Sequence, residues 1–131
     1  MTIKVLIVDD HKLFRQGLRS LMSTRDDIVE VVGEAATAAE AIKLAGQLRP
    51  DVILMDIYMP EVDGLEATRA IKKLYPEIAV VILTSSEKDS HLFEAVRADA
   101  AGYLLKNLDA DELFNMLEGV AKGEAAMTRA M

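Results

Sequence analysis

The chain has 131 residues, of which 51% are hydrophobic and 28% charged, and it contains no cysteine. This length suffices to bury one hydrophobic core, and the lack of cysteine excludes disulfides and thiolate metal sites. The formal net charge of −7 disfavours direct contact with nucleic acid. We see no signal peptide and no apolar run that could span a membrane, so we expect a cytoplasmic location and no membrane partner.

Five segments along the chain have the character of strands. Four are short, continuous apolar runs, which are typical of strands buried on both faces of a sheet. These runs cover residues 5–8, 52–55, 80–83 and 103–105. The fifth segment, residues 28–34, is interrupted by charged side chains, and this pattern predicts an edge strand of the same sheet.

Amphipathic stretches with helical spacing separate and follow these strands. In chain order they predict helices over about 12–23, from Thr37, over 64–74, over 89–99 and from Asp109. Thr37 and Asp109 are each followed three residues later by glutamate, which is the pattern of a helical capping box. Strict alternation of strand and helix predicts an α/β fold with a parallel sheet between helices. We therefore expect a doubly wound (βα)5 sandwich of three layers, flavodoxin-like, with strand order 2-1-3-4-5.

Polar side chains follow four of the five predicted strands. In a doubly wound sheet the ligand site lies beyond the carboxyl ends of the strands, so these side chains are expected to meet there. They are Asp9 and Asp10 after the first strand, Asp56 after the third, Thr84 at the end of the fourth and Lys106 after the fifth. Three converging carboxylates repel one another, and a hard divalent cation with oxygen ligands relieves this repulsion. The pattern therefore predicts a site for Mg²⁺ (or Mn²⁺) that is suited to receiving a phosphoryl group.

The sequence resembles the receiver domains of two-component response regulators. The likeness rests on five motifs in order: Val8-Asp9-Asp10-His11, Met55 to Pro60, Asp63-Gly64, Leu83-Thr84-Ser85 and Gly102 to Lys106. It covers about residues 3–122. The segment after Asp10 and the closing Gly123-Glu-Ala pattern are similar to the NarL/FixJ subfamily, whose members usually carry a LuxR-type helix-turn-helix domain.

The resemblance implies a role for each residue of the predicted site. Asp56 is the expected phosphoacceptor, Asp9, Asp10 and Asp56 are expected metal ligands, and the main-chain carbonyl of Tyr58 is expected to complete the set. Thr84 and Lys106 are expected to contact the phosphoryl group, and Thr84 and Tyr103 to form the switch pair.

The resemblance also implies partners, a domain organisation and one departure from the family. The expected partners are a sensor histidine kinase and a second copy of the chain in a phosphorylation-promoted homodimer. Residues 1–122 are expected to form the receiver domain, and residues 123–131 to begin a linker toward a DNA-binding domain absent from this chain. Asn107 stands where many receivers have a proline, often with a cis bond, which leaves the geometry of that loop open.

Other interpretations of the same residues remain. His11 is expected to be a solvated residue of the first helical turn rather than a metal ligand, and Tyr103 has an alternative as an ordinary half-buried aromatic. A phosphohydrolase of similar fold is disfavoured because Tyr58 stands where its general acid would be. A flavin-binding domain is disfavoured because Asp9 and Asp10 would repel a phosphate. A pseudo-receiver that acts without phosphorylation remains the alternative to the switch, which is not expected to be an enzyme in the ordinary sense.

Overall fold

The structure is a computed structural model that describes residues 2–85, 92–123 and 126–127. Its centre is a parallel sheet with the order β2-β1-β3-β4-β5-β6. The strands are β1 (Ile3–Val8), β2 (Val29–Ala35), β3 (Val52–Asp56), β4 (Ala79–Thr84), β5 (Gly102–Leu105) and β6 (Ala126–Met127). The predicted order of the first five strands is confirmed, and β2 lies at one edge as expected.

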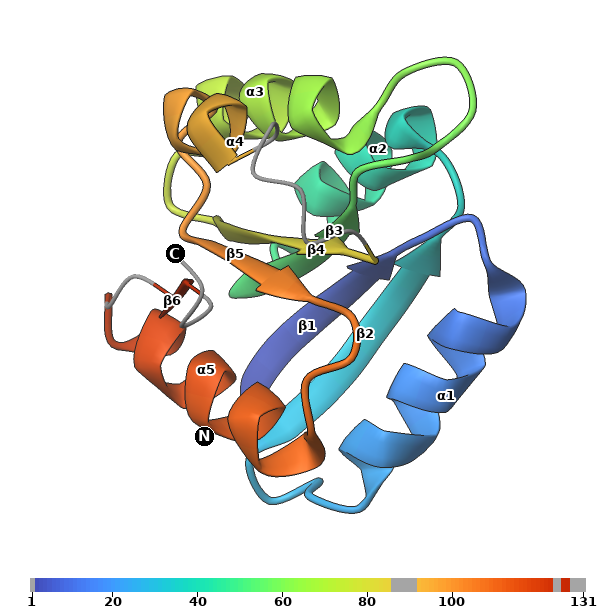
Figure 1. The fold of residues 1–131 in the computed structure, drawn as a ribbon, viewed down its shortest axis with the longest axis vertical. Helices are drawn as coiled ribbons and strands as arrows, with labels where there is room; N and C mark the ends of the chain where they lie inside the picture. Colours follow the sequence, from blue (N-terminus) through green and yellow to red (C-terminus); the bar gives the residue numbers. More distant parts are fainter. Residues whose placement is uncertain (1, 86–91, 124–125, 128–131) are drawn as a thin grey trace.

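Helices cover both faces of the sheet, as Figure 1 shows. They are α1 (Lys12–Ser23), α2 (Ala38–Leu48), α3 (Gly64–Leu74), α4 (Leu92–Arg97) and α5 (Ala110–Ala121). The helices α1 and α5 pack on one face, and α2, α3 and α4 on the other (Figure 1). This is the predicted three-layer α/β sandwich.

The strands divide their side chains between two hydrophobic layers. In β1, Leu6 and Val8 pack in the layer under α2 and α3, whereas Val5 and Ile7 pack in the layer under α1 and α5. All four are at most 1% exposed. Alternation places successive strand residues on opposite faces, so a continuous apolar run supplies both layers at once. Burial of each such side chain contributes about 1.5–3 kcal/mol to the stability of the fold.

Short polar side chains fix where three helices begin. Asp109 accepts a hydrogen bond from the Glu112 amide at 2.8 Å and forms a complete capping box at the start of α5. Thr37 accepts from the amide of Glu40 in the same way at the start of α2. Asp63 begins α3, where its side chain accepts from Glu66 N at 2.9 Å. These bonds satisfy amides that have no partner within the helix.

The structure differs from the prediction in three segments. The second strand is shifted by one residue, from 28–34 to Val29–Ala35. The fourth helix spans Leu92–Arg97 instead of 89–99; residues 89–91 lie outside the described residues, and Asp99 adopts a positive φ of 68° that ends the helical path. A short sixth strand, β6, pairs with β5 in the segment expected to be a linker. Its two residues carry too little periodicity for a prediction.

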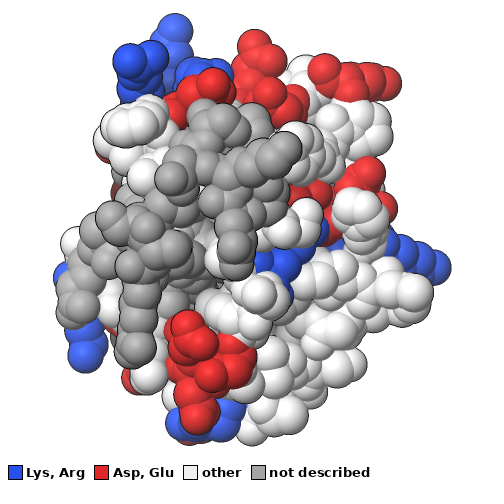
Figure 2. Space-filling view, viewed as in Figure 1, with Lys and Arg blue, Asp and Glu red and all other residues white. Residues whose placement is uncertain are grey.

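In the described part of the chain, no helix combines the length and apolarity needed to cross a bilayer. On the face drawn in Figure 2, Lys and Arg side chains form small groups, and acidic and uncharged side chains separate these groups from one another. A continuous basic surface of the kind that binds nucleic acid is not formed by the described residues of that face.

Candidate functional site

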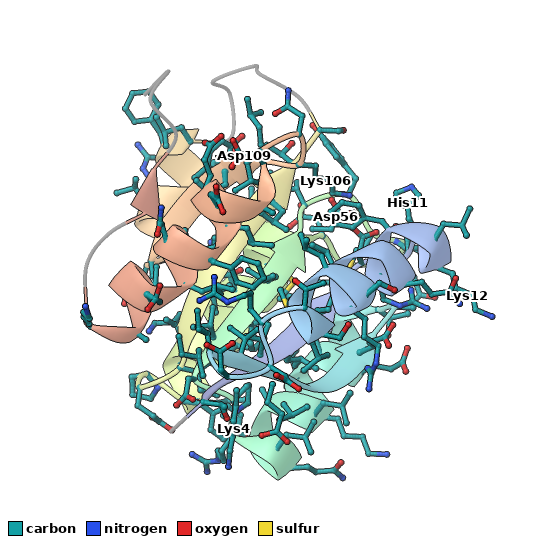
Figure 3. The ribbon with its side chains drawn as sticks, turned by 90° about the horizontal axis from the view of Figure 1, so that it is seen from below. Lys4, His11, Lys12, Asp56, Lys106 and Asp109 are labelled. Carbon is teal, nitrogen blue, oxygen red and sulfur yellow. The ribbon has the colours of Figure 1, made fainter. Side chains whose placement is uncertain are left out.

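Charged side chains from three strand ends meet at one end of the sheet. Figure 3 shows Asp56, Lys106 and His11 gathered there, with Lys4 toward the opposite end of the molecule. Asp56 is the last residue of β3, Lys106 follows β5, and His11 belongs to the loop between β1 and α1. The carboxyl ends of parallel strands share one rim, so residues far apart in sequence become neighbours here.

Asp56 is a buried carboxylate whose charge is only partly compensated. Its residue is 3% exposed, and its Oδ1 lies 3.2 Å from Nζ of Lys106. Its Oδ2 is buried and accepts no hydrogen bond from any described residue. Burial raises the pKa of Asp56 above its ordinary value, and the nearby charge of Asp9 raises it further, while Lys106 opposes both.

Lys106 approaches the acids from the end of β5. Its backbone amide donates to the carbonyl of Thr84 at 2.8 Å, which extends the pairing of β4 with β5 by one step. Its Nζ donates to Oδ2 of Asp9 at 2.7 Å, and its side chain is only 15% exposed. Lys106 therefore bridges two carboxylates that come from different strands.

The loop after β1 supplies the remaining polar groups. Asp9 is 1% exposed and its Oδ1 accepts from the backbone amide of His11 at 2.8 Å. The guanidinium of Arg15 donates to the main-chain carbonyl of Asp9 and pairs with Glu34 at 3.1 Å, which holds this loop from the α1 side. The buried position of Asp9 is thus fixed by hydrogen bonds to its side chain and to its backbone.

His11 lies closer to the acids than the sequence indicated. Its Nδ1 is 2.8 Å from Asp9 Oδ1, 3.2 Å from Asp10 Oδ1 and 3.9 Å from Asp56 Oδ2. The hydrogen bond to Asp9 and the charges of Asp10 and Asp9 raise the pKa of His11. The side chain is 64% exposed, as expected of a residue in the first turn, but its ring nitrogen belongs to the acidic cluster. Its position directly after Asp9 and Asp10 was the sequence signal for this contact.

The acidic cluster is compatible with a divalent cation. Asp9, Asp10, His11 and Asp56 each offer a ligand atom, and these atoms lie within 4.8 Å of one another. The carboxylate oxygens are ligands of the kind that Mg²⁺ and Mn²⁺ prefer. The Oδ2 atom of Asp56 is buried and accepts no hydrogen bond from the described residues, so a cation close to this carboxylate would offset the cost of burying its charge.

The other predicted site residues lie around this cluster. Thr84 ends β4 and is fully buried, with its backbone paired to Leu105. Tyr103 is also fully buried and packs in the layer under α2, α3 and α4, so it is not half-buried as the alternative interpretation assumed. Tyr58 lies two residues beyond β3 and is 51% exposed. No cis peptide bond occurs in the described residues, so the bond between Lys106 and Asn107 is trans.

Comparison with known proteins identifies a family to which the chain is similar. The sequence model described as the response regulator receiver domain matches residues 5–118. Response regulator protein VraR of Staphylococcus aureus is 46% identical over 125 residues, which are 95% of this chain and 59% of that protein. The chain therefore spans about three fifths of the length of the curated relatives it matches.

Solved structures show the same likeness. A two-component response regulator of the LuxR family from Aurantimonas sp. SI85-9A1 superposes with a TM-score of 0.91 at 35% identity, covering 98% of this chain and 91% of that one. The isolated REC domain of RcsB from Salmonella enterica serovar Typhimurium, solved in the presence of the phosphomimetic BeF3−, gives a TM-score of 0.88 at 26% identity and covers 99% and 96%. The motif match, the strand order and these likenesses agree. The chain is similar to LuxR-type response regulators, and it belongs to the response regulator receiver domain family of two-component systems.

Proposed function

We propose that this domain is a Mg²⁺-dependent switch that accepts a phosphoryl group on Asp56 from a sensor histidine kinase. The observation that carries the proposal is the environment of Asp56, a buried carboxylate with one oxygen beside Lys106 and the other without a hydrogen bond from any described residue. A carboxylate held in this way has an oxygen available as a nucleophile. The reaction forms a bond from that oxygen to phosphorus, while the bond from phosphorus to the donor breaks and its electron pair leaves with the donor.

The neighbouring residues supply the electrostatics of this transfer. Lys106 provides a positive charge within contact distance of Asp56, and this charge can attract an oxygen of the phosphoryl group during the transfer. The hydroxyl of Thr84, at the end of the adjacent strand, is a hydrogen-bond donor for another phosphoryl oxygen. Asp9, Asp10, Asp56 and the main-chain carbonyl of Tyr58 would hold the cation. When bound, Mg²⁺ supplies compensation for the negative charge shared by the carboxylates and the phosphoryl oxygens.

A phosphoryl group on Asp56 would act through Thr84 and Tyr103. A phosphoryl group on Asp56 carries about −1.5 to −2 charges in place of the single charge of the carboxylate, and this change can bias an equilibrium between two conformations. Thr84 is next to the site, and Tyr103 lies one strand further on, where it packs beneath α4. We infer that movement of this pair changes the surface formed by α4 and β5.

The partners of the whole protein follow from this role. The kinase, a homodimer strengthened by phosphorylation and a cytoplasmic location are parts of the proposal. We also propose that residues 1–122 form the receiver domain and that residues 123–131 lead toward a DNA-binding domain, in keeping with relatives that are longer than this chain.

The proposal is tested by intact mass after incubation with acetyl phosphate. Wild type and Asp56→Asn are compared with Mg²⁺ and with EDTA, and Asp51→Asn serves as a matched control because it removes a carboxylate at the opposite end of β3. We expect one phosphoryl adduct that requires Mg²⁺, forms on wild type and on Asp51→Asn, and is absent from Asp56→Asn. No adduct under any condition would favour the pseudo-receiver instead.

A further inference from the structure

An aromatic ring covers Lys106 on the side that faces α1. The Nζ atom lies 4.4 Å from the centroid of the Phe14 ring. Phe14 is partly buried and packs in the same hydrophobic layer as Leu18 and Leu113. Together these residues and Lys106 line an apolar groove between α1 and the segment that leads from β5 into α5. The ammonium group therefore contacts two carboxylates and one ring face, and the Lys106 side chain as a whole is 15% exposed.

The ring differs from the carboxylates in one respect. Asp9 is a proposed metal ligand and Asp56 is the proposed phosphoacceptor, so both carboxylates change partners when a cation or a phosphoryl group arrives. Phe14 takes part in neither event. A ring face attracts a cation through its quadrupole without accepting a proton or binding the metal, and this attraction grows as water is excluded. Phe14 can thus hold Lys106 in place throughout the reaction.

We propose that Phe14 is a positioning residue for Lys106, and that its ring keeps the ammonium group directed at Asp56 during phosphoryl transfer. This inference rests on the proposed function and names a residue of the same site. The requirement is for an aromatic face, because an aliphatic side chain of similar volume fills the groove but offers the cation no quadrupole. Without the ring, Lys106 loses a fixed contact and gains access to water, which weakens its pull on the phosphoryl oxygens.

The test compares rates of adduct formation with acetyl phosphate and Mg²⁺. Phe14→Leu keeps an apolar side chain in the groove, and Phe14→Tyr keeps the ring. We expect Phe14→Leu to slow phosphorylation about three- to tenfold and Phe14→Tyr to remain within about twofold of wild type. Phe114→Leu is the matched control, because it removes a ring of α5 that lies under Arg25, whose guanidinium carbon is 5.7 Å from the ring centroid, whereas Lys106 lies over Phe14.

A double-mutant cycle separates positioning from general loss of stability. In a Lys106→Met background, which retains the apolar stem, Phe14→Leu should cause no further slowing because its effect passes through the ammonium group. Equal rates for wild type and Phe14→Leu overturn the inference while leaving the proposed function intact. Slowing that persists in the Lys106→Met background, or that Phe114→Leu reproduces, overturns it as well.

A second measurement does not depend on phosphorylation. Limiting acetic anhydride labels lysines according to their accessibility, and peptide mass spectrometry reports Lys106 relative to the exposed Lys122. We expect Phe14→Leu to raise the relative labelling of Lys106 severalfold and Phe14→Tyr to leave it unchanged. If wild type forms no adduct, the proposed function fails, and this labelling still decides whether the ring shields Lys106. Unchanged labelling in Phe14→Leu would show that it does not.

Discussion

Asp56→Asn is expected to stabilise the metal-free domain even though it removes the proposed phosphoacceptor. The wild-type side chain is 3% exposed, and its Oδ2 accepts no hydrogen bond from the described residues. A buried acceptor without a partner costs about 1–3 kcal/mol. Asparagine removes the charge and adds an N–H donor beside the carboxylates of Asp9 and Asp10. Lys106 keeps its 2.7 Å contact with Asp9, so the substitution does not leave that cation unpaired.

These terms give an expected gain of about 1–2 kcal/mol in the free energy of unfolding. For a domain of this size the gain corresponds to a rise in Tm of about 3–8 °C. Circular dichroism at 222 nm during thermal and urea unfolding in EDTA measures both quantities. Asp27→Asn is the control for net charge, because that carboxylate is 69% exposed and its loss should change stability by less than about 0.5 kcal/mol.

The difference between wild type and Asp56→Asn should depend on pH. Because the pKa of Asp56 is raised in the folded state, the folded protein takes up its proton at a higher pH than the unfolded chain does. Lowering the pH through that raised pKa therefore stabilises wild type relative to the variant, and raising it has the opposite effect. The gap should be largest at neutral pH and close toward the ordinary range of a carboxyl. A variant no more stable than wild type in EDTA at neutral pH would refute this reasoning.

Three further substitutions test how the fold supports the site. A Cβ on Gly64 would overlap the main-chain carbonyl oxygen of Asp56, so Gly64→Ala should lower the free energy of unfolding by about 1–3 kcal/mol and slow phosphorylation. Gly17→Ala is the control, because a Cβ at this position of α1 meets open space; urea unfolding should show it to be neutral or stabilising by up to about 1 kcal/mol. Tyr103→Ala empties a fully buried position and should cost about 3–5 kcal/mol by the same measurement; an unchanged stability would place this ring outside the core. Asp109→Ala removes the capping box of α5 and should cost about 0.5–2 kcal/mol, with Asp109→Asn restoring most of the loss.

Much of the fold was determined by local sequence patterns. The continuous apolar runs predicted strands buried on both faces, and the bounds expected for α1 and α3, residues 12–23 and 64–74, agree with the structure. The helix starts at Thr37 and Asp109 are also confirmed, because a capping side chain acts only on amides within its own first turn. Apolar periodicity and capping are local properties, so they can be recognised without knowledge of tertiary contacts.

The composition of the candidate site was likewise accessible from sequence. Once a parallel sheet is predicted, each strand must place its carboxyl end at the same rim. This rule was enough to bring Asp9, Asp10, Asp56, Thr84 and Lys106 together. The chemical roles of these residues stay predictions until the adduct has been measured.

Only the tertiary structure decided which side chains of the site contact one another. The 2.7 Å contact between Lys106 and Asp9 joins residues 97 positions apart, and no local pattern indicates which carboxylate oxygen accepts a hydrogen bond from the ammonium group of Lys106. The approach of His11 to three carboxylates and the Phe14 ring over Lys106 depend on how α1 is turned against the sheet. The pairing of β6 with β5 likewise depends on where α5 returns the chain. Local preferences select the elements, but distances between elements are set by packing, and the electrostatics of this site follow from those distances.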